Sequence, residues 1–165
     1  MVAKLRLYSG LILLVFVTGH LTNNILGLHS FEAMDAASEW TTHPWRTEVG
    51  MVLMIGAFLT HFFLVSWSLF RRQTMKMKTW EAVQNIFGLL IPVLLIGHFA
   101  GTKLLNKVMG LQNGYAFEML ALFEFAPEFG TVQFLLVLLV WSHGCIGLHT
   151  WLRLKPGYLR LQTLP

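Results

Sequence analysis

Charged side chains are scarce in this sequence of 165 residues: only 12% are Asp, Glu, Lys or Arg, while 55% are hydrophobic. A soluble globular domain typically carries about 25% charged residues, so this chain lacks the polar cover that a water-exposed surface needs. The mean hydropathy of +0.61 agrees with this. Cys145 is the only cysteine, which excludes an intrachain disulfide. The composition therefore excludes an ordinary soluble domain.

Several signatures of function are missing as well. The sequence has no Gly-rich phosphate loop and no nucleophile-elbow motif, so nothing in it points to phosphate binding or hydrolysis. The formal charge of +4 does not predict nucleic-acid binding, because the basic residues form short clusters at the ends of apolar runs. No internal repeat is evident.

What the sequence does contain is four apolar runs, each long enough to cross a bilayer core, which takes about 20 helical residues. They cover residues 5–28, 49–70, 82–105 and 130–152. We therefore predict an all-α membrane protein, with a four-transmembrane-helix bundle as a single membrane domain over residues 1–165 and a tail over 153–165. Two outer-loop segments, 31–40 and 115–125, are candidates for short helices along the membrane interface.

The lysines and arginines predict the orientation of the chain. Nine of them flank the membrane runs on one side, against three on the other: Lys4, Arg6, Arg71, Arg72, Lys76, Lys78, Arg153, Lys155 and Arg160, against Arg46, Lys103 and Lys107. By the positive-inside rule, both termini and the middle loop are cytoplasmic.

The histidines are the most informative residues, because each membrane run carries at least one: His20, His61, His98, and His143 with His149. A lone histidine of this kind is usually a packing residue. Ionisable residues at membrane depth are costly, however, and one on each of four helices favours a functional site inside the bundle. His29 and His43 fall in the first outer loop, where an exposed position is expected.

Depth sorts these histidines into pairs. His61 and His143 each lie ten residues before an arginine, which places both about 15 Å from the cytoplasmic boundary. His20 and His98 lie roughly 21–25 Å from that boundary. Two histidines at equal depth suit the two axial positions of one haem iron. We therefore predict an outer haem held by His20 and His98, and an inner haem held by His61 and His143.

His149 competes with His143 for the inner site, but the two point about 120° apart on a helix. Depth favours His143, and two interpretations of His149 stay open: an interfacial polar residue, or a contact to a haem propionate or a quinone. A zinc site is less suitable, because zinc needs a compact tetrahedral set of ligands and these histidines lie at two different membrane depths. The sequence has no Cys-x-x-Cys-His motif, which excludes covalently attached c-type haem, so the haems are predicted to be b-type. Small residues near the candidate ligands would permit close approach of a macrocycle: Gly19, Gly97, Gly101, Gly144 and Gly147.

Two stretches of the sequence resemble a known family. The run Ser9–His20 (SGLILLVFVTGH) and the run His143–Leu148 (HGCIGL) are similar to the first and last ligand helices of dihaem cytochrome b subunits of succinate dehydrogenase and fumarate reductase. His61 and His98 fall where that family's other two ligands lie. The resemblance implies that the first and third ligands share one haem and the second and fourth share the other, which agrees with the depths.

The chain also resembles the membrane anchors of proteobacterial class III adenylate cyclases, over residues 4–24, 68–80 and 141–158. That resemblance implies a dihaem anchor in a bacterial inner membrane, responsive to the redox state of quinone and attached to a cytoplasmic cyclase that generally works as a dimer. Those cyclases continue into further segments and a catalytic domain. This sequence stops at Pro165, so cyclase activity is not expected of it alone.

Three hypotheses follow. The first is a dihaem b-type cytochrome that anchors a signalling effector and exchanges electrons with quinone. The second is an anchor subunit of a respiratory succinate dehydrogenase or fumarate reductase type complex, which would use the same haems and bind dehydrogenase subunits. The third is a haem-free structural or oligomerisation bundle. Neighbouring genes separate the first two, and an absorption spectrum separates both from the third.

Overall fold

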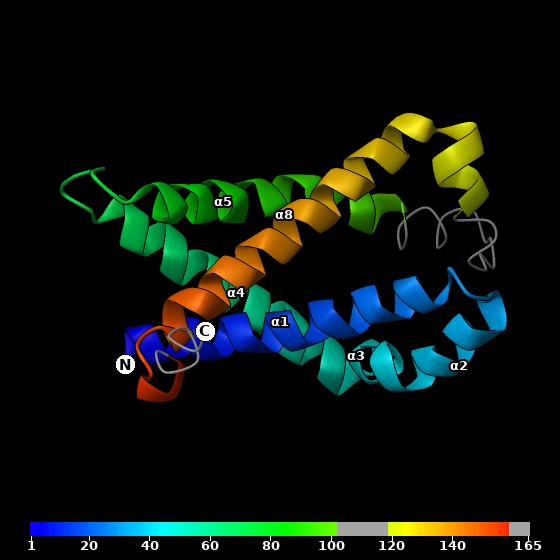
Figure 1. The fold of residues 1–165 in the computed structure, drawn as a ribbon, viewed down its shortest axis with the longest axis horizontal. Coiled ribbons are helices and arrows are strands. Elements are labelled where there is room, and N and C mark those ends of the chain that lie inside the picture. The colour runs from blue at the N-terminus through cyan, green and yellow to red at the C-terminus, as the bar shows by residue number, and fades with distance from the viewer. Residues whose placement is uncertain (102–118, 159–165) are drawn as a thin grey trace, which may run out of the picture. The chain divides into compact units, whose positions relative to one another are not determined.

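The computed structural model describes residues 1–101 and 119–158, and every regular element within these ranges is a helix (Figure 1). Four of the described helices are long and apolar enough to cross a membrane: α1 (Val2–Leu26), α4 (Glu48–Phe70), α5 (Thr79–Phe99) and α8 (Pro127–Leu152). The prediction of an all-α, multi-pass membrane protein is thus confirmed. The predicted spans agree with these helices to within a few residues, except that residues 102–105 lie outside the described residues.

The chain divides into two compact units, Met1–Lys76 and Met77–Pro165. The boundary falls in the basic loop between α4 and α5, and each unit is built around one pair of long helices. In both pairs the helices run antiparallel, because residues near the start of the first helix contact residues in the second half of the other.

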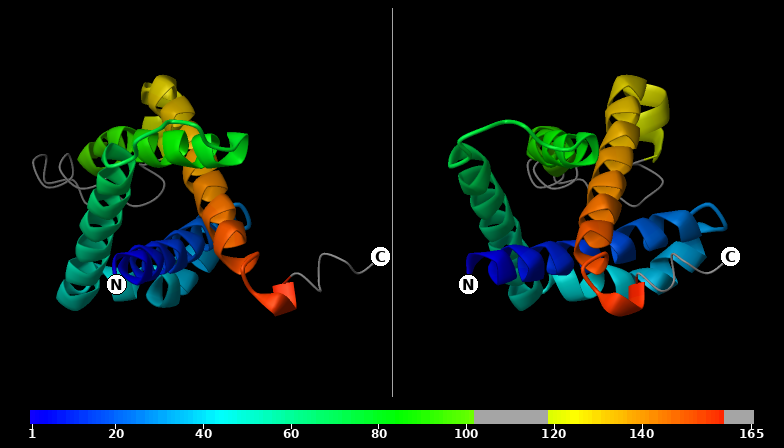
Figure 2. Two further views of the ribbon diagram at one scale, coloured as in Figure 1. Left: turned by 90° about the vertical axis from the view of Figure 1, so that its left-hand side faces the viewer. Right: turned by 60° about the vertical axis from the view of Figure 1, so that its left-hand side comes forward.

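In the first unit, α1 packs against α4, and two short helices connect them: α2 (Phe31–Thr41) and α3 (His43–Arg46). Helix α2 folds back along the end of α1, as the further views also show (Figure 2). Ser30 caps its N-terminus, where the Ser30 hydroxyl oxygen accepts a hydrogen bond from the Ala33 amide at 3.0 Å. Met34 fills the space against α1 and is only 1% exposed. The predicted helix over residues 31–40 is confirmed.

In the second unit, α5 packs against α8. A short π-helix, η2 (Ala121–Phe125), precedes α8 and contacts it. Pro127 stands in the first turn of α8, where its missing N–H costs no helical hydrogen bond. The interfacial helix predicted over 115–125 is helical over its described part, and residues 115–118 lie outside the described residues.

Large apolar side chains on the long helices are strongly exposed. Val15, Phe63 and Phe134 are each exposed by more than 60%, and similar residues recur on all four helices. In water an apolar surface of this extent would be costly, whereas lipid tails cover it without penalty. The polar groups that do lie between the helices are therefore the informative ones.

Candidate haem-ligating histidines

His61 of α4 is held by the backbone of α1. Its Nδ1 atom lies 3.0 Å from the carbonyl oxygen of Arg6 and 3.4 Å from Oγ of Ser9. The Ser9 hydroxyl itself donates to the Arg6 carbonyl at 3.1 Å. A carbonyl oxygen can only accept, so the proton of the neutral ring is on Nδ1 and the lone pair is on Nε2. This arrangement is typical of metal-ligating histidines, whose second nitrogen donates to a carbonyl.

Gly10 allows this contact. In an α-helix the carbonyl of residue i points toward residue i+4, so a ring that reaches the Arg6 carbonyl must lie over Gly10. A Cβ atom on Gly10 would stand 2.9 Å from Cε1 and 3.1 Å from Nδ1 of His61. Any side chain at this position would therefore push the imidazole ring away from the carbonyl.

His143 is held in the same way in the second unit. Its Nδ1 atom lies 2.9 Å from the carbonyl oxygen of Gln84 in α5. The residue four positions further on is Gly88, where a Cβ atom would stand 2.7 Å from Cε1 of His143. The ring of His143 thus occupies the space of a missing side chain, as the ring of His61 does.

The matching contacts reveal an internal repeat, which corrects the reading of the sequence as lacking one. Residues 10–20 (GLILLVFVTGH) and 88–98 (GLLIPVLLIGH) share Gly-Leu at their start and Gly-His at their end, with the same spacing. In each unit the first glycine lies under a histidine of the second helix. Each of those histidines stands ten residues before an arginine. The two helix pairs are therefore two versions of one arrangement.

His98 and His20, the histidines at the end of this motif, differ in their surroundings. Nδ1 of His98 lies 2.9 Å from Oε1 of Gln133 in α8. The ring of His20 stacks on Phe16, with centroids 5.7 Å apart, and Phe16 meets Trp45 of α3 edge-on. All four candidate ligands are half-buried.

His149 lies at the cytoplasmic end of α8, by the predicted orientation, and its side chain is exposed. Its Nδ1 atom is 3.0 Å from the hydroxyl of Tyr158, the last described residue of the tail. Nearby, the guanidinium of Arg153 lies 4.6 Å above the ring of Trp80, in the first turn of α5. The structure thus gives His149 a partner in the tail. Its predicted contact to a propionate or quinone stays a prediction.

The loop histidines and the flanking glycines can also be placed. His29 and His43 are exposed, as predicted. Among the glycines predicted to admit a macrocycle, Gly97 and Gly101 have open space around them, while Gly19 lies against the backbone of Thr41 at the end of α2. Gly147 lies against the Gln84 side chain. Gly10 and Gly88 are the described glycines that lie against the rings of His61 and His143, and neither was among the glycines predicted from the sequence.

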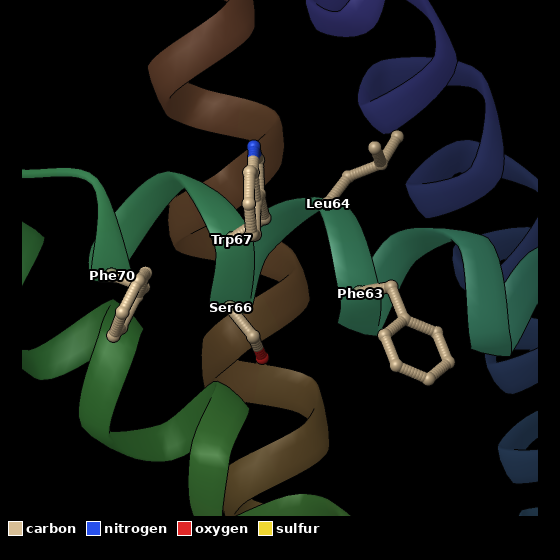
Figure 3. Close-up of a pocket in the computed structure, with 5 residues that line it drawn as sticks. All are labelled: Phe63, Leu64, Ser66, Trp67 and Phe70. Atoms are coloured by element: carbon tan, nitrogen blue, oxygen red, sulfur yellow. The ribbon is translucent and has the colours of Figure 1, made fainter.

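An open apolar hollow runs along the second half of α4 (Figure 3). Phe63, Leu64, Ser66, Trp67 and Phe70 line it. The Ser66 hydroxyl oxygen is buried and has no hydrogen-bond partner among the described residues. Aromatic walls with one unsatisfied polar atom are suited to a flat ligand that carries a polar group.

The described residues define a class of protein: a multi-pass membrane protein that holds imidazole rings between antiparallel helices. Among residues 1–101 and 119–158, no three His, Cys, Asp or Glu side chains lie close enough to share a metal ion. A haem iron needs only two axial ligands from the protein, so a haem site does not require such a cluster of three. Comparison with known protein families, curated proteins and solved structures finds no match for this chain.

Proposed function

We propose that this chain is a dihaem b-type membrane cytochrome, with His61 and His143 as ligands of the inner haem and His20 and His98 as ligands of the outer one. The observation that carries the proposal is the repeated placement of His61 and His143, each with Nδ1 bonded to a backbone carbonyl and its ring over a glycine. The pairing of the four histidines rests on membrane depth counted along the sequence.

The donor set fits a haem iron. Neutral imidazole is a common axial ligand, and a hydrogen bond from Nδ1–H to a carbonyl or carboxamide oxygen fixes the tautomer that coordinates through Nε2. His61, His98 and His143 each have such a bond. A bound haem supplies one-electron redox chemistry. The role of the chain is to orient the rings and to surround them with apolar side chains.

We propose membrane quinone as the redox partner, in line with the resemblance to quinone-reactive dihaem cytochromes. The hollow along α4 supports this assignment, because its lining is aromatic and the Ser66 hydroxyl can bond a quinone oxygen.

The downstream role that we favour is a redox-responsive anchor for a cytoplasmic effector of the adenylate cyclase type, with the chain as a homodimer in a bacterial inner membrane. Support comes from the contact between His149 and Tyr158, which ties the tail to the helix that carries His143. A change in the packing of α8 would therefore reach the tail directly. The alternative, an anchor of a respiratory dehydrogenase complex, uses the same histidines. Neighbouring genes discriminate the two roles: an effector domain encoded in frame, or dehydrogenase genes alongside.

Quinol reduction tests the redox role. The purified, oxidised protein in detergent is mixed with a short-chain quinol under argon, and the absorption of reduced haem b is followed. We expect reduction by quinol in the parent protein and slower reduction in Trp67→Ala. The matched control is Phe134→Ala on α8, which removes a similarly exposed aromatic side chain away from the hollow. If dithionite reduces the haem but quinol does not, the chain is a cytochrome without the proposed quinone reaction.

A further inference from the structure

Gln133 is the acceptor for His98, and it is a side chain rather than backbone. Its Oε1 atom lies 2.9 Å from Nδ1 of His98. His61 and His143 bond instead to main-chain carbonyls, which every residue type provides. The electronic environment of His98 can therefore change with the identity of one residue.

The internal repeat shows how unusual this position is. Gln133 stands ten residues before His143 in α8, and the position ten residues before His61 in α4 is Met51. A thioether is only a weak hydrogen-bond acceptor, whereas a carboxamide oxygen is a strong one. The two units thus share their inner histidine arrangement and differ in the residue that corresponds to Gln133.

We propose that Gln133 is a positioning residue for His98, which orients its ring and tunes the outer haem to a lower midpoint potential than it would have without this hydrogen bond. This inference rests on the proposed dihaem function. A hydrogen bond accepted from Nδ1–H raises the basicity of a ligating imidazole. A more basic ligand favours the more highly charged, oxidised iron, and hydrogen bonding around the ligands is one of the ways in which proteins set haem potentials.

The test is a redox titration of the full-length purified protein, followed by the absorption of reduced haem b. Gln133→Met removes the strong acceptor at similar volume and gives α8 the residue that α4 has. We expect one of two haem components to move to a higher midpoint potential while the other stays in place. Gln133→Glu keeps an oxygen acceptor in either protonation state, so its midpoint is expected at or below the parent value. Met51→Leu is the control and should leave both components unchanged.

Loss of one haem component from Gln133→Met, with retention in Gln133→Glu, also supports the positioning role. The inference is overturned if Gln133→Met keeps both haems at their parent potentials, or if Gln133→Glu and Gln133→Met change them in the same way. Failure of the proposed function itself has a different signature, because the parent protein would then carry no haem to titrate.

Discussion

Replacing Gly10 by alanine tests whether the contact between α1 and the His61 ring organises the site. The new methyl carbon would lie 2.9 Å from Cε1 and 3.1 Å from Nδ1 of His61. Carbon atoms in favourable contact are about 3.5–4.0 Å apart, so the ring must retreat by about half an ångström or more. This movement draws Nδ1 away from the Arg6 carbonyl, from which it is now 3.0 Å distant.

The expected cost has two parts. Overpacking of a well-packed contact costs about 1–3 kcal/mol, and a lost hydrogen bond costs about 1 kcal/mol. Alanine is favoured over glycine in a helix by about 1 kcal/mol, which offsets part of this loss. We expect a net decrease of about 1–3 kcal/mol in the free energy of unfolding, together with loss of the haem component that depends on His61.

The matched control is Gly56→Ala, because no atom lies within 4 Å of the position that its Cβ would take. It should keep both haems and gain up to about 1 kcal/mol. Both variants are compared by haem content per chain and by thermal unfolding in detergent. By the internal repeat, Gly88→Ala should act on His143 as Gly10→Ala acts on His61. The reasoning is refuted if Gly10→Ala retains the full haem content and is as stable as Gly56→Ala.

Three further predictions concern single side chains. His143→Ala should abolish the inner haem, whereas His149→Ala should leave the haem content intact, since His149 is exposed and bonds to Tyr158. Haem quantification checks this prediction, and the reverse result would exchange the roles of the two histidines. In a redox titration, His20→Ala and His98→Ala should retain the same haem component, and His61→Ala should retain the other haem component. If His20→Ala and His61→Ala retain the same component, the pairs are misassigned. Hydrogen bonds from the backbone amide of Glu32 and from the Ser30 side chain lower the pKa of the Glu32 carboxyl group. Its contribution to the stability of α2 is therefore present above the ordinary pKa of a glutamate and is lost as the pH falls through the lowered pKa. The protection factors of the α2 amides, which are exchange rates corrected for the intrinsic effect of pH, should therefore fall at acid pH in the parent and in Glu39→Gln. They should not change in this way in Glu32→Gln.

The long helices could be predicted from the sequence because length and hydropathy alone determine whether a segment crosses a bilayer. Helix α2 was predicted only as a candidate over residues 31–40, and in the structure it begins directly after the helix cap Ser30. The exposure of His29 and His43 followed from their place in the segment that connects the first two membrane runs.

The contacts of the candidate ligands were harder to predict, because they join different helices. Spacing along α1 cannot show that the ring of His61 lies over Gly10, since this depends on how far α4 slides against α1. Gln133 was missed for the same reason. One signal was present: the Gly-Leu and Gly-His pairs recur at equal spacing in residues 10–20 and 88–98. Aligning the two helix pairs on this motif would have singled out Gly10, Gly88 and the difference between Met51 and Gln133.

The central claim, that this chain binds two b-type haems, is tested most directly by a dithionite-reduced minus oxidised absorption spectrum with haem quantification. The account predicts two haems per chain, with the absorption of reduced haem b, all extractable with acidified acetone because no thioether bond holds them. A haem content near one per chain, a pigment that stays on the polypeptide, or a colourless protein after expression with ample haem would contradict it.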